Sequence, residues 1–379
     1  MQARYLSLSP YNLVRIILGE RKASDTDADN VYTRGARYLE DWIRDGVLVQ
    51  DGRPAFYAYF QEFAPPDSDQ RLTRKGFIGL GAVEDYLANI VHRHERTLSG
   101  PKKDRLEVLR HTHAHFGQIF MLYPDREQAI DRILDEAAGC APTGEVTDEY
   151  GAVHRVWRID GEAQTAEMQR LMSDKKLVIA DGHHRYETAL NFRNEHPELE
   201  DARRVMMTFV NMYSPGLRIL ATHRVVSNLP DFDINRFIER VSSEFSVWRV
   251  AAAKELRPLL DDTSVVRIGL ADGSSFYVLE RVRRPDDLDV RILHDDLLGK
   301  VLGITEEAVR EEKNIRYMRG IEAAVDEVRQ GRAQLAFLLQ PTSVQQVADV
   351  SFSAGVMPQK STDFYPKLLS GMTIYKLER

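Results

Sequence analysis

KKLVIADGHHRYETALNFRNEHP, residues 175–197, is the stretch that decides the fold class. The apolar run over 177–180 is typical of a strand buried on both faces, and Asp181 with Gly182 predicts a tight turn. After the turn, Tyr186 and Ala189 begin an apolar pattern at helical spacing, which ends at Pro197. The stretch therefore predicts a strand, a sharp turn and a helix.

Strand and helix patterns alternate on both sides of this unit. Before residue 228 they predict helices over 31–44, 104–109 and 127–138, and strands over 55–63, 75–81, 118–123, 205–212 and 217–226. After it they predict helices over 234–243, 252–260, 293–301 and 320–329, and strands over 247–250, 265–270, 275–281 and 335–339. We predict an α/β (α+β) fold with a mixed sheet, an N-terminal unit over residues 1–227 and a C-terminal α+β unit over residues 228–379.

The composition excludes several classes of protein. The 379 residues include 51 Lys and Arg against 58 Asp and Glu, and this net charge of −7 provides no positive field for duplex nucleic acid. No apolar stretch reaches the roughly 20 residues of a membrane span, so we expect no membrane partner and a cytoplasmic protein. Cys140 is the single cysteine, which excludes an intramolecular disulfide, and we expect its thiol to be buried.

The turn at residues 181–185 concentrates polar chemistry. The start of a helix offers free N–H groups and the positive end of the helix dipole, and His183, His184 and Arg185 add side-chain donors there. Asp181 could orient a histidine, hold Mg²⁺ through a phosphate, or act as a base. In the alternative reading, Asp181 only caps the helix and the histidines pack against carbonyl groups. We favour an anion site.

Several motifs in order resemble the domain-of-unknown-function 1015 family over almost the whole chain. They are SPYNLVRIIL (9–18), the aromatic strand that ends at Gln61, HERT (94–97), KDR (103–105), ADGHHRYETAL (180–190) and MPQKSTDFYPKLLSG (357–371). The DGHHR turn also resembles, more distantly, the phosphate-binding turn of the ParB and sulfiredoxin superfamily, which includes nucleotide-dependent kinases of free serine. Family members carry an APPYDV-like segment before SPYN, whereas eight residues precede Ser9 here. We expect either a truncated start or a missing strand and loop.

The resemblance implies a ParB-like core in which residues 181–185, Gly182 included, bind the phosphates of ATP or ADP, with Mg²⁺ held at Asp181. The superfamily's kinases use a glutamate as base, and Glu95 is our candidate on chemistry alone, because a carboxylate near a histidine can take a hydroxyl proton. Glu95 could equally be a solvated member of a charged run. A second donor-rich loop suits an anion or docks the C-terminal tail, and it contains Lys360, Ser361, Thr362 and Lys367.

Three functions fit this sequence. The first is a nucleotide-dependent phosphotransferase acting on a small hydroxy compound, possibly free serine. The second is a ParB-like nucleotide-binding regulator, either non-catalytic or hydrolysing the nucleotide. The third is a metal-dependent hydrolase built on His111, His113 and His115, although these histidines also fit a surface cluster. No P-loop or Rossmann glycine motif is present, and the oligomeric state is not predicted.

Overall fold

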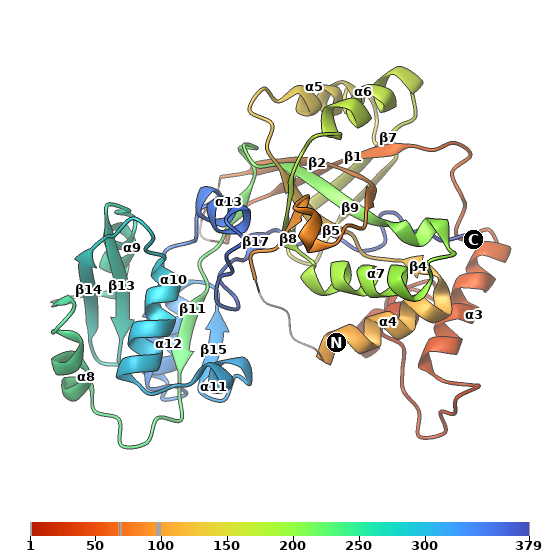
Figure 1. Ribbon diagram of the computed structural model, residues 1–379. Helices are drawn as coiled ribbons and strands as arrows, with labels where there is room; N and C mark the ends of the chain where they lie inside the picture. Colours follow the sequence, from red (N-terminus) through yellow and green to blue (C-terminus); the bar gives the residue numbers. More distant parts are fainter. Residues whose placement is uncertain (1, 67, 69, 96–99, 379) are drawn as a thin grey trace.

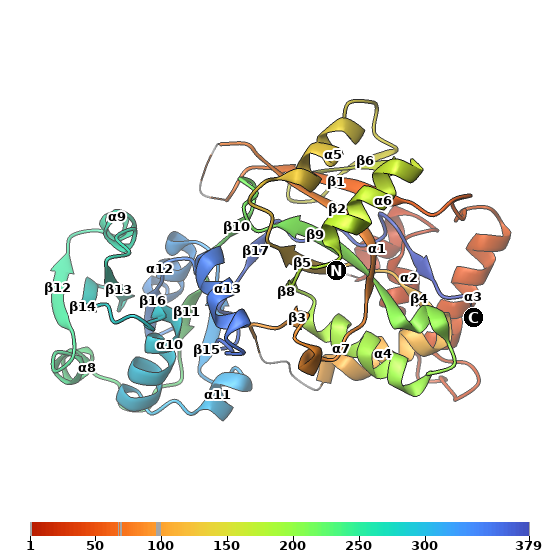
Figure 2. The ribbon, with the colours of Figure 1, turned by 45° about the horizontal axis from the view of Figure 1, so that its top comes forward.

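The structure is a computed structural model that describes residues 2–66, 68, 70–95 and 100–378. It contains two large β-sheets side by side, each with helices packed on it (Figure 1). Parallel and antiparallel pairs occur within the larger sheet, so the predicted α/β class with a mixed sheet is confirmed. The same arrangement is seen from a second direction in Figure 2.

The larger sheet has eight strands and contains the stretch that decides the fold. In spatial order they are β3 (Val91–His92), β8 (Leu177–Asp181), β5 (Ile119–Tyr123), β9 (Arg204–Asn211), β2 (Leu72–Ala82), β1 (Phe56–Phe63), β7 (Val153–Ile159) and β6 (Gly144–Thr147). The central strands β5 and β9 are buried almost throughout, because both faces of the sheet are covered. In this order β8 is the second strand from one edge, next to the short strand β3, so its carboxyl end is accessible to other segments of the chain.

Alternate residues of β5 separate the two faces of this sheet. Ile119 and Met121 join an apolar cluster with side chains of three helices, α5 (Ala129–Ala137), α6 (Glu162–Met172) and α7 (His183–Glu195). Phe120 and Leu122 point to the opposite face and join the cluster that extends into the second unit. The second unit, together with Met357 and Phe364 of the C-terminal segment, therefore packs on the face opposite to these helices.

The second unit is built on an antiparallel sheet. Its strands, in spatial order, are β12 (Ser246–Val250), β14 (Phe276–Val282), β13 (Val265–Ala271), β16 (Leu335–Leu338), β11 (His223–Val226) and β15 (Ile315–Met318). Its helical segments are α8 (Ile234–Val241), α9 (Leu256–Leu260), α10 (Asp289–Ile292), the π-helix Leu293–Val301, α11 (Glu306–Arg310), α12 (Ile321–Arg329) and α13 (Val344–Phe352). The hairpin predicted between β13 and β14 is confirmed.

The single strand predicted over residues 217–226 is wrong. The segment forms two short strands, β10 (Arg218–Ile219) and β11, which pair in different sheets because the chain crosses from one unit to the other between them. The division into residues 1–227 and 228–379 stays a prediction.

The last residues of the chain return to the first unit. Strand β17 (Phe364–Tyr365) pairs with β10, and β18 (Tyr375–Lys376) pairs with β4 (Ala114–His115). Figures 1 and 2 place the C-terminus beside the N-terminal helices, far from the second sheet. We call residues 357–369 the strap, because this segment runs between the two units.

Four further helices flank the larger sheet, namely α1 (Gln2–Leu8), α2 (Val14–Ile17), α3 (Val31–Arg44) and α4 (Gly100–Thr112). The helix predicted over 31–44 is confirmed, with Asn30 capping its first turn. Over the described ranges, no helix combines the length and apolar character that crossing a membrane requires. Cys140 is exposed, so the expectation of a buried thiol is wrong; it follows α5 in a surface turn.

Candidate functional site

The strand, turn and helix predicted from residues 175–197 are present as β8 and α7. Gly182 joins them with φ at +96°, a left-handed conformation that favours glycine. A Cβ atom at Gly182 would lie 3.1 Å from Nε of Arg185, so the missing side chain also lets this guanidinium approach the backbone. Oδ1 of Asp181 accepts the N–H of Gly182 at 2.8 Å, but no side-chain hydrogen bond caps the helix, whose first turn carries no acidic residue. The start of α7 therefore remains electropositive.

A lysine of the strap reaches the turn. Nζ of Lys367 lies 3.3 Å from Oδ2 of Asp181 and 3.2 Å from Oδ1 of Asp363, so it bridges two carboxylates. Asp363 also accepts from the guanidinium of Arg319 at 2.8 Å. Burial alone would raise the pKa of Asp181, but the positive charges of Lys367 and Arg185 bring it down to about 2. Asp181 is therefore ionised and surrounded by cations.

Two buried imidazoles lie behind the turn. His183 is 8% exposed, and its ring centroid lies 4.9 Å from that of His94 in an edge-to-face arrangement. Nδ1 of His94 donates to the carbonyl of Ile179 at 2.8 Å, which fixes its ring. Burial, together with His94, holds the pKa of His183 well below its usual value. His183 is therefore neutral at pH 7.

Buried nitrogen atoms at the turn include Nε2 of His183 and Nε of Arg185, which have no hydrogen-bond partner among the described residues. Burial lowers the pKa of Arg185, and the positive charge of Arg105 lowers it further. His184 lies next to them on the first turn and is partly exposed. Buried polar atoms normally have partners, so these two nitrogens are suited to a ligand that brings acceptor oxygens.

Glu95 contacts the strap rather than bulk solvent. Its Oε1 accepts hydrogen bonds from the N–H groups of Ser361 and Thr362, at 3.1 and 3.2 Å, and from the hydroxyl of Thr362 at 3.2 Å. The hydroxyl of Ser361 donates to Pro358. The donors predicted to bind an anion at Ser361 and Thr362 thus already bind the carboxylate of Glu95. Thr97, in the HERT motif, lies outside the described residues.

Lys360, the remaining member of the predicted second loop, is exposed at the surface of the strap. Its backbone is left-handed, with φ at +58°, and its carbonyl accepts from Arg224 at 3.0 Å. The structure therefore brings Asp181, His183, Arg185 and Lys367 together at one turn, while Lys360 lies on the part of the strap that faces Arg224. The functional roles predicted for these residues stay predictions.

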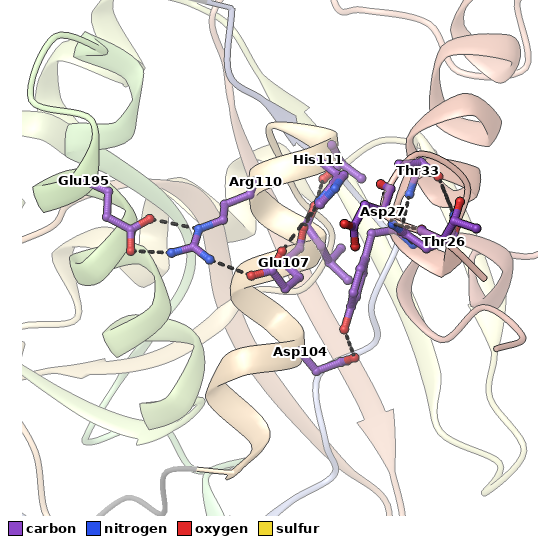
Figure 3. A network of polar contacts seen from close by, with 12 residues as sticks. Thr26, Asp27, Thr33, Asp104, Glu107, Arg110, His111 and Glu195 are labelled. Atoms are coloured by element: carbon purple, nitrogen blue, oxygen red, sulfur yellow. Dashed lines mark hydrogen bonds and ion pairs between the residues drawn. The ribbon is translucent and has the colours of Figure 1, made fainter.

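The three alternating histidines lie in different environments. His111 on α4 stacks on Tyr32, His113 packs against Phe192, and His115 on β4 stacks on Tyr375. Figure 3 shows His111 within the polar contacts between α3, α4 and α7. No group of three or more His, Cys, Asp or Glu side chains suited to a metal ion occurs in the part of the chain that the structure describes.

The polar residues that hold the strap were not predicted from the sequence. Asp363 binds the ammonium of Lys367 and is itself bound by Arg319, and the buried side chains of Gln61 and Arg74 bind the strap backbone. The sequence does contain a signal for these contacts: Gln61 and Arg74 lie in the largely apolar strands β1 and β2, and buried polar groups need partners. Their partner is a segment about 300 residues away in the sequence, which periodicity does not identify.

Comparison with known proteins gives one family and several remote structures. The family described as protein of unknown function (DUF1015) matches residues 1–301, and no curated protein matches the chain. A conserved hypothetical protein from Pyrococcus furiosus has 13% identity and a TM-score of 0.41, over 79% of this chain and 95% of that one. A free serine kinase in complex with AMP has 13% identity and a TM-score of 0.41, over 76% and 86%. SbnI with a C-terminal truncation, from Staphylococcus aureus, has 10% identity and a TM-score of 0.36, over 77% and 85%.

Proposed function

This chain belongs to the DUF1015 family of proteins of unknown function, and we propose that it is a nucleotide-dependent phosphotransferase acting on a small hydroxy compound. The family membership predicted from the sequence motifs is confirmed, over residues that include the turn at 181–185. ATP or ADP is the proposed donor, and free serine is the first acceptor to test. A nucleotide substrate and an exposed cysteine fit a cytoplasmic enzyme.

One observation carries the proposal: buried nitrogens without partners lie at a cationic helix start. Nε2 of His183 and Nε of Arg185 lack hydrogen bonds among the described residues, and the ammonium of Lys367 lies 3.3 Å from Asp181. A phosphate supplies several acceptor oxygens and negative charge, which these groups and the N–H groups of α7 can bind together. Two carboxylates, Asp181 and Asp363, face three cations, which are Lys367, Arg185 and Arg319, so an anionic ligand balances the remaining positive charge.

The proposed chemistry depends on positioning and charge neutralisation. Arg185 and Lys367 would bind phosphate oxygens, and His183 would donate from its buried ring nitrogen. Asp181 is ionised, which suits a ligand of Mg²⁺, because that ion is usually held by one or two carboxylates together with phosphates. Bound Mg²⁺ would neutralise charge on the phosphates. Glu95 and Asp181 are the two candidates to take the proton of the acceptor hydroxyl.

A thermal-shift screen of nucleotides with and without Mg²⁺ tests the binding step. A nucleotide at about 100 times its dissociation constant should stabilise the protein by ~2.7 kcal/mol. Nucleotide consumption should then be measured with hydroxy acceptors, serine first. Binding without turnover of any acceptor would favour the regulator, and the absence of nucleotide binding would contradict the proposal.

A further inference from the structure

The strap is attached to the larger sheet through a buried guanidinium. Arg74 on β2 is 1% exposed, and it donates to two consecutive strap carbonyls, Tyr365 O at 3.2 Å and Pro366 O at 2.6 Å. Its Nε donates to Oε1 of Gln61 at 3.0 Å, and its Cζ lies 4.6 Å from the centre of the Phe120 ring. Among the described residues, no carboxylate lies within ion-pair distance of Arg74, so the strap carbonyls and Gln61 satisfy this cation.

Strand β1, which neighbours β2, binds the next groups of the strap. Nε2 of Gln61 donates to Lys367 O at 2.9 Å, and the hydroxyl of Tyr59 accepts the N–H of Leu369 at 3.2 Å. Tyr59 is oriented in turn by His154, whose Nδ1 lies 2.7 Å from the hydroxyl. Backbone groups on both sides of the Lys367 side chain are therefore fixed by buried side chains of the sheet.

This attachment determines where the ammonium of Lys367 can lie. With its backbone fixed, the side chain reaches the position between Asp181 and Asp363, although half of its surface is exposed. An exposed lysine on a free loop would lose rotamer and backbone freedom to hold such a position. The fixed backbone removes the backbone part of that entropic cost before any ligand binds.

We infer that Arg74 is a positioning residue, which places Lys367 at the phosphate-binding turn by holding Tyr365 and Pro366. Only the expected effect on nucleotide binding rests on the proposed function. The placement of Lys367 by Arg74 does not depend on it. A buried cation bound only to neutral groups is costly, and an apolar side chain would fill the same space more cheaply. The planar guanidinium of arginine can donate to two neighbouring carbonyls at once, whereas lysine has a single ammonium group.

The first experiment needs no ligand and measures the separation between Nζ of Lys367 and Oδ2 of Asp181 in crystal structures of the unmodified chain and of its variants. In the unmodified chain this separation is 3.3 Å. R74K should lengthen it beyond ion-pair distance while keeping the charge at residue 74, because the carbonyls of Tyr365 and Pro366 lose their two-pronged donor.

R224K is the matched control. Arg224 is also 1% exposed and donates to two consecutive strap carbonyls, of Gln359 and Lys360, but these lie eight and seven residues before Lys367. R224K should leave the separation between Lys367 and Asp181 unchanged even where it lowers thermal stability. If R74K does not fold, Gln61→Leu gives the same test, since Gln61 binds the carbonyl of Lys367 directly.

The second readout is nucleotide affinity. R74K and K367A should each weaken binding about tenfold or more, and the double variant R74K/K367A should bind no more weakly than K367A. An unchanged separation between Lys367 and Asp181 in R74K, or effects of R74K and K367A on nucleotide affinity that simply add, would overturn the inference. If R74K displaces Lys367, but neither the unmodified chain nor any variant binds a nucleotide, only the proposed function is contradicted.

Discussion

Oε1 of Glu95 accepts two hydrogen bonds from Thr362, one from the backbone N–H and one from the hydroxyl, both at 3.2 Å. Glu95 follows strand β3 and Thr362 belongs to the strap, so this carboxylate joins the edge of the larger sheet to the end of the chain. None of the described residues hydrogen-bonds its other oxygen, Oε2. Oε1 of Glu95 therefore anchors the strap, and the proposed role of Glu95 as the base would fall to Oε2.

Two substitutions separate these roles. We expect Glu95→Gln to lower turnover by ~10²–10⁴, the usual cost of losing a general base, because an amide does not take the proton. Its oxygen still accepts the N–H groups of the strap, so nucleotide affinity should survive. Glu95→Ala should also lower the free energy of unfolding by ~1–3 kcal/mol, because buried donors lose their acceptor. Full turnover in Glu95→Gln would leave Glu95 as an anchor only.

Replacing Arg185 should weaken nucleotide binding without unfolding the protein. The loss of a charge-assisted hydrogen bond to phosphate costs ~1.5–3 kcal/mol, so Arg185→Ala should raise the dissociation constant about tenfold to a hundredfold. Calorimetric titration measures this change. The matched control is Arg110→Ala on α4, whose guanidinium lies between Glu107 and Glu195 (Figure 3). It should change stability by less than ~1 kcal/mol and leave affinity unaltered.

Stability should depend on pH through Asp181. Its pKa in the folded chain is about 2, below the usual 3.8, so the ionised carboxylate stabilises the folded state above about pH 4. That contribution is lost as the pH falls towards 2. Chemical unfolding of the unmodified chain and of Asp181→Asn should therefore differ most above pH 4, and the difference should shrink below it. A difference that stays constant from pH 6 to pH 2 would contradict the placement of Lys367 beside Asp181.

Local sequence pattern predicted the turn, and it could not predict the strap contacts. Strand β8, Gly182 and helix α7 lie within one short stretch, where spacing and turn chemistry are sufficient. His94 and Thr362 are 268 residues apart in the sequence, yet Nε2 of His94 lies 2.7 Å from the Thr362 hydroxyl. Arg74 and Arg224 resemble surface cations in the sequence, because only the folded strap supplies the carbonyls that let them be buried.

Nucleotide binding should take up protons near neutral pH. His183 is neutral in the free protein, because burial and His94 hold its pKa well below the usual 6.5. A phosphate beside it favours the protonated ring, so its pKa should rise in the complex. Calorimetry at pH 6.5 in buffers of different ionisation enthalpy should show uptake of a fraction of a proton, which His183→Gln abolishes. Heats that do not depend on the buffer would contradict a contact between His183 and phosphate.

Duplex DNA should not bind with meaningful affinity, and this separates the enzyme from the regulator. The net charge of −7 gives no general attraction to the phosphate backbone, and the cations at the turn are few and partly paired with Asp181 and Asp363. A gel-shift titration in low salt should show weak association at most, which disappears near physiological ionic strength. Lys367→Ala is the informative variant, because residual low-salt binding through the turn should weaken further in it. Sequence-specific binding that survives physiological salt would favour a DNA-binding regulator over a phosphotransferase.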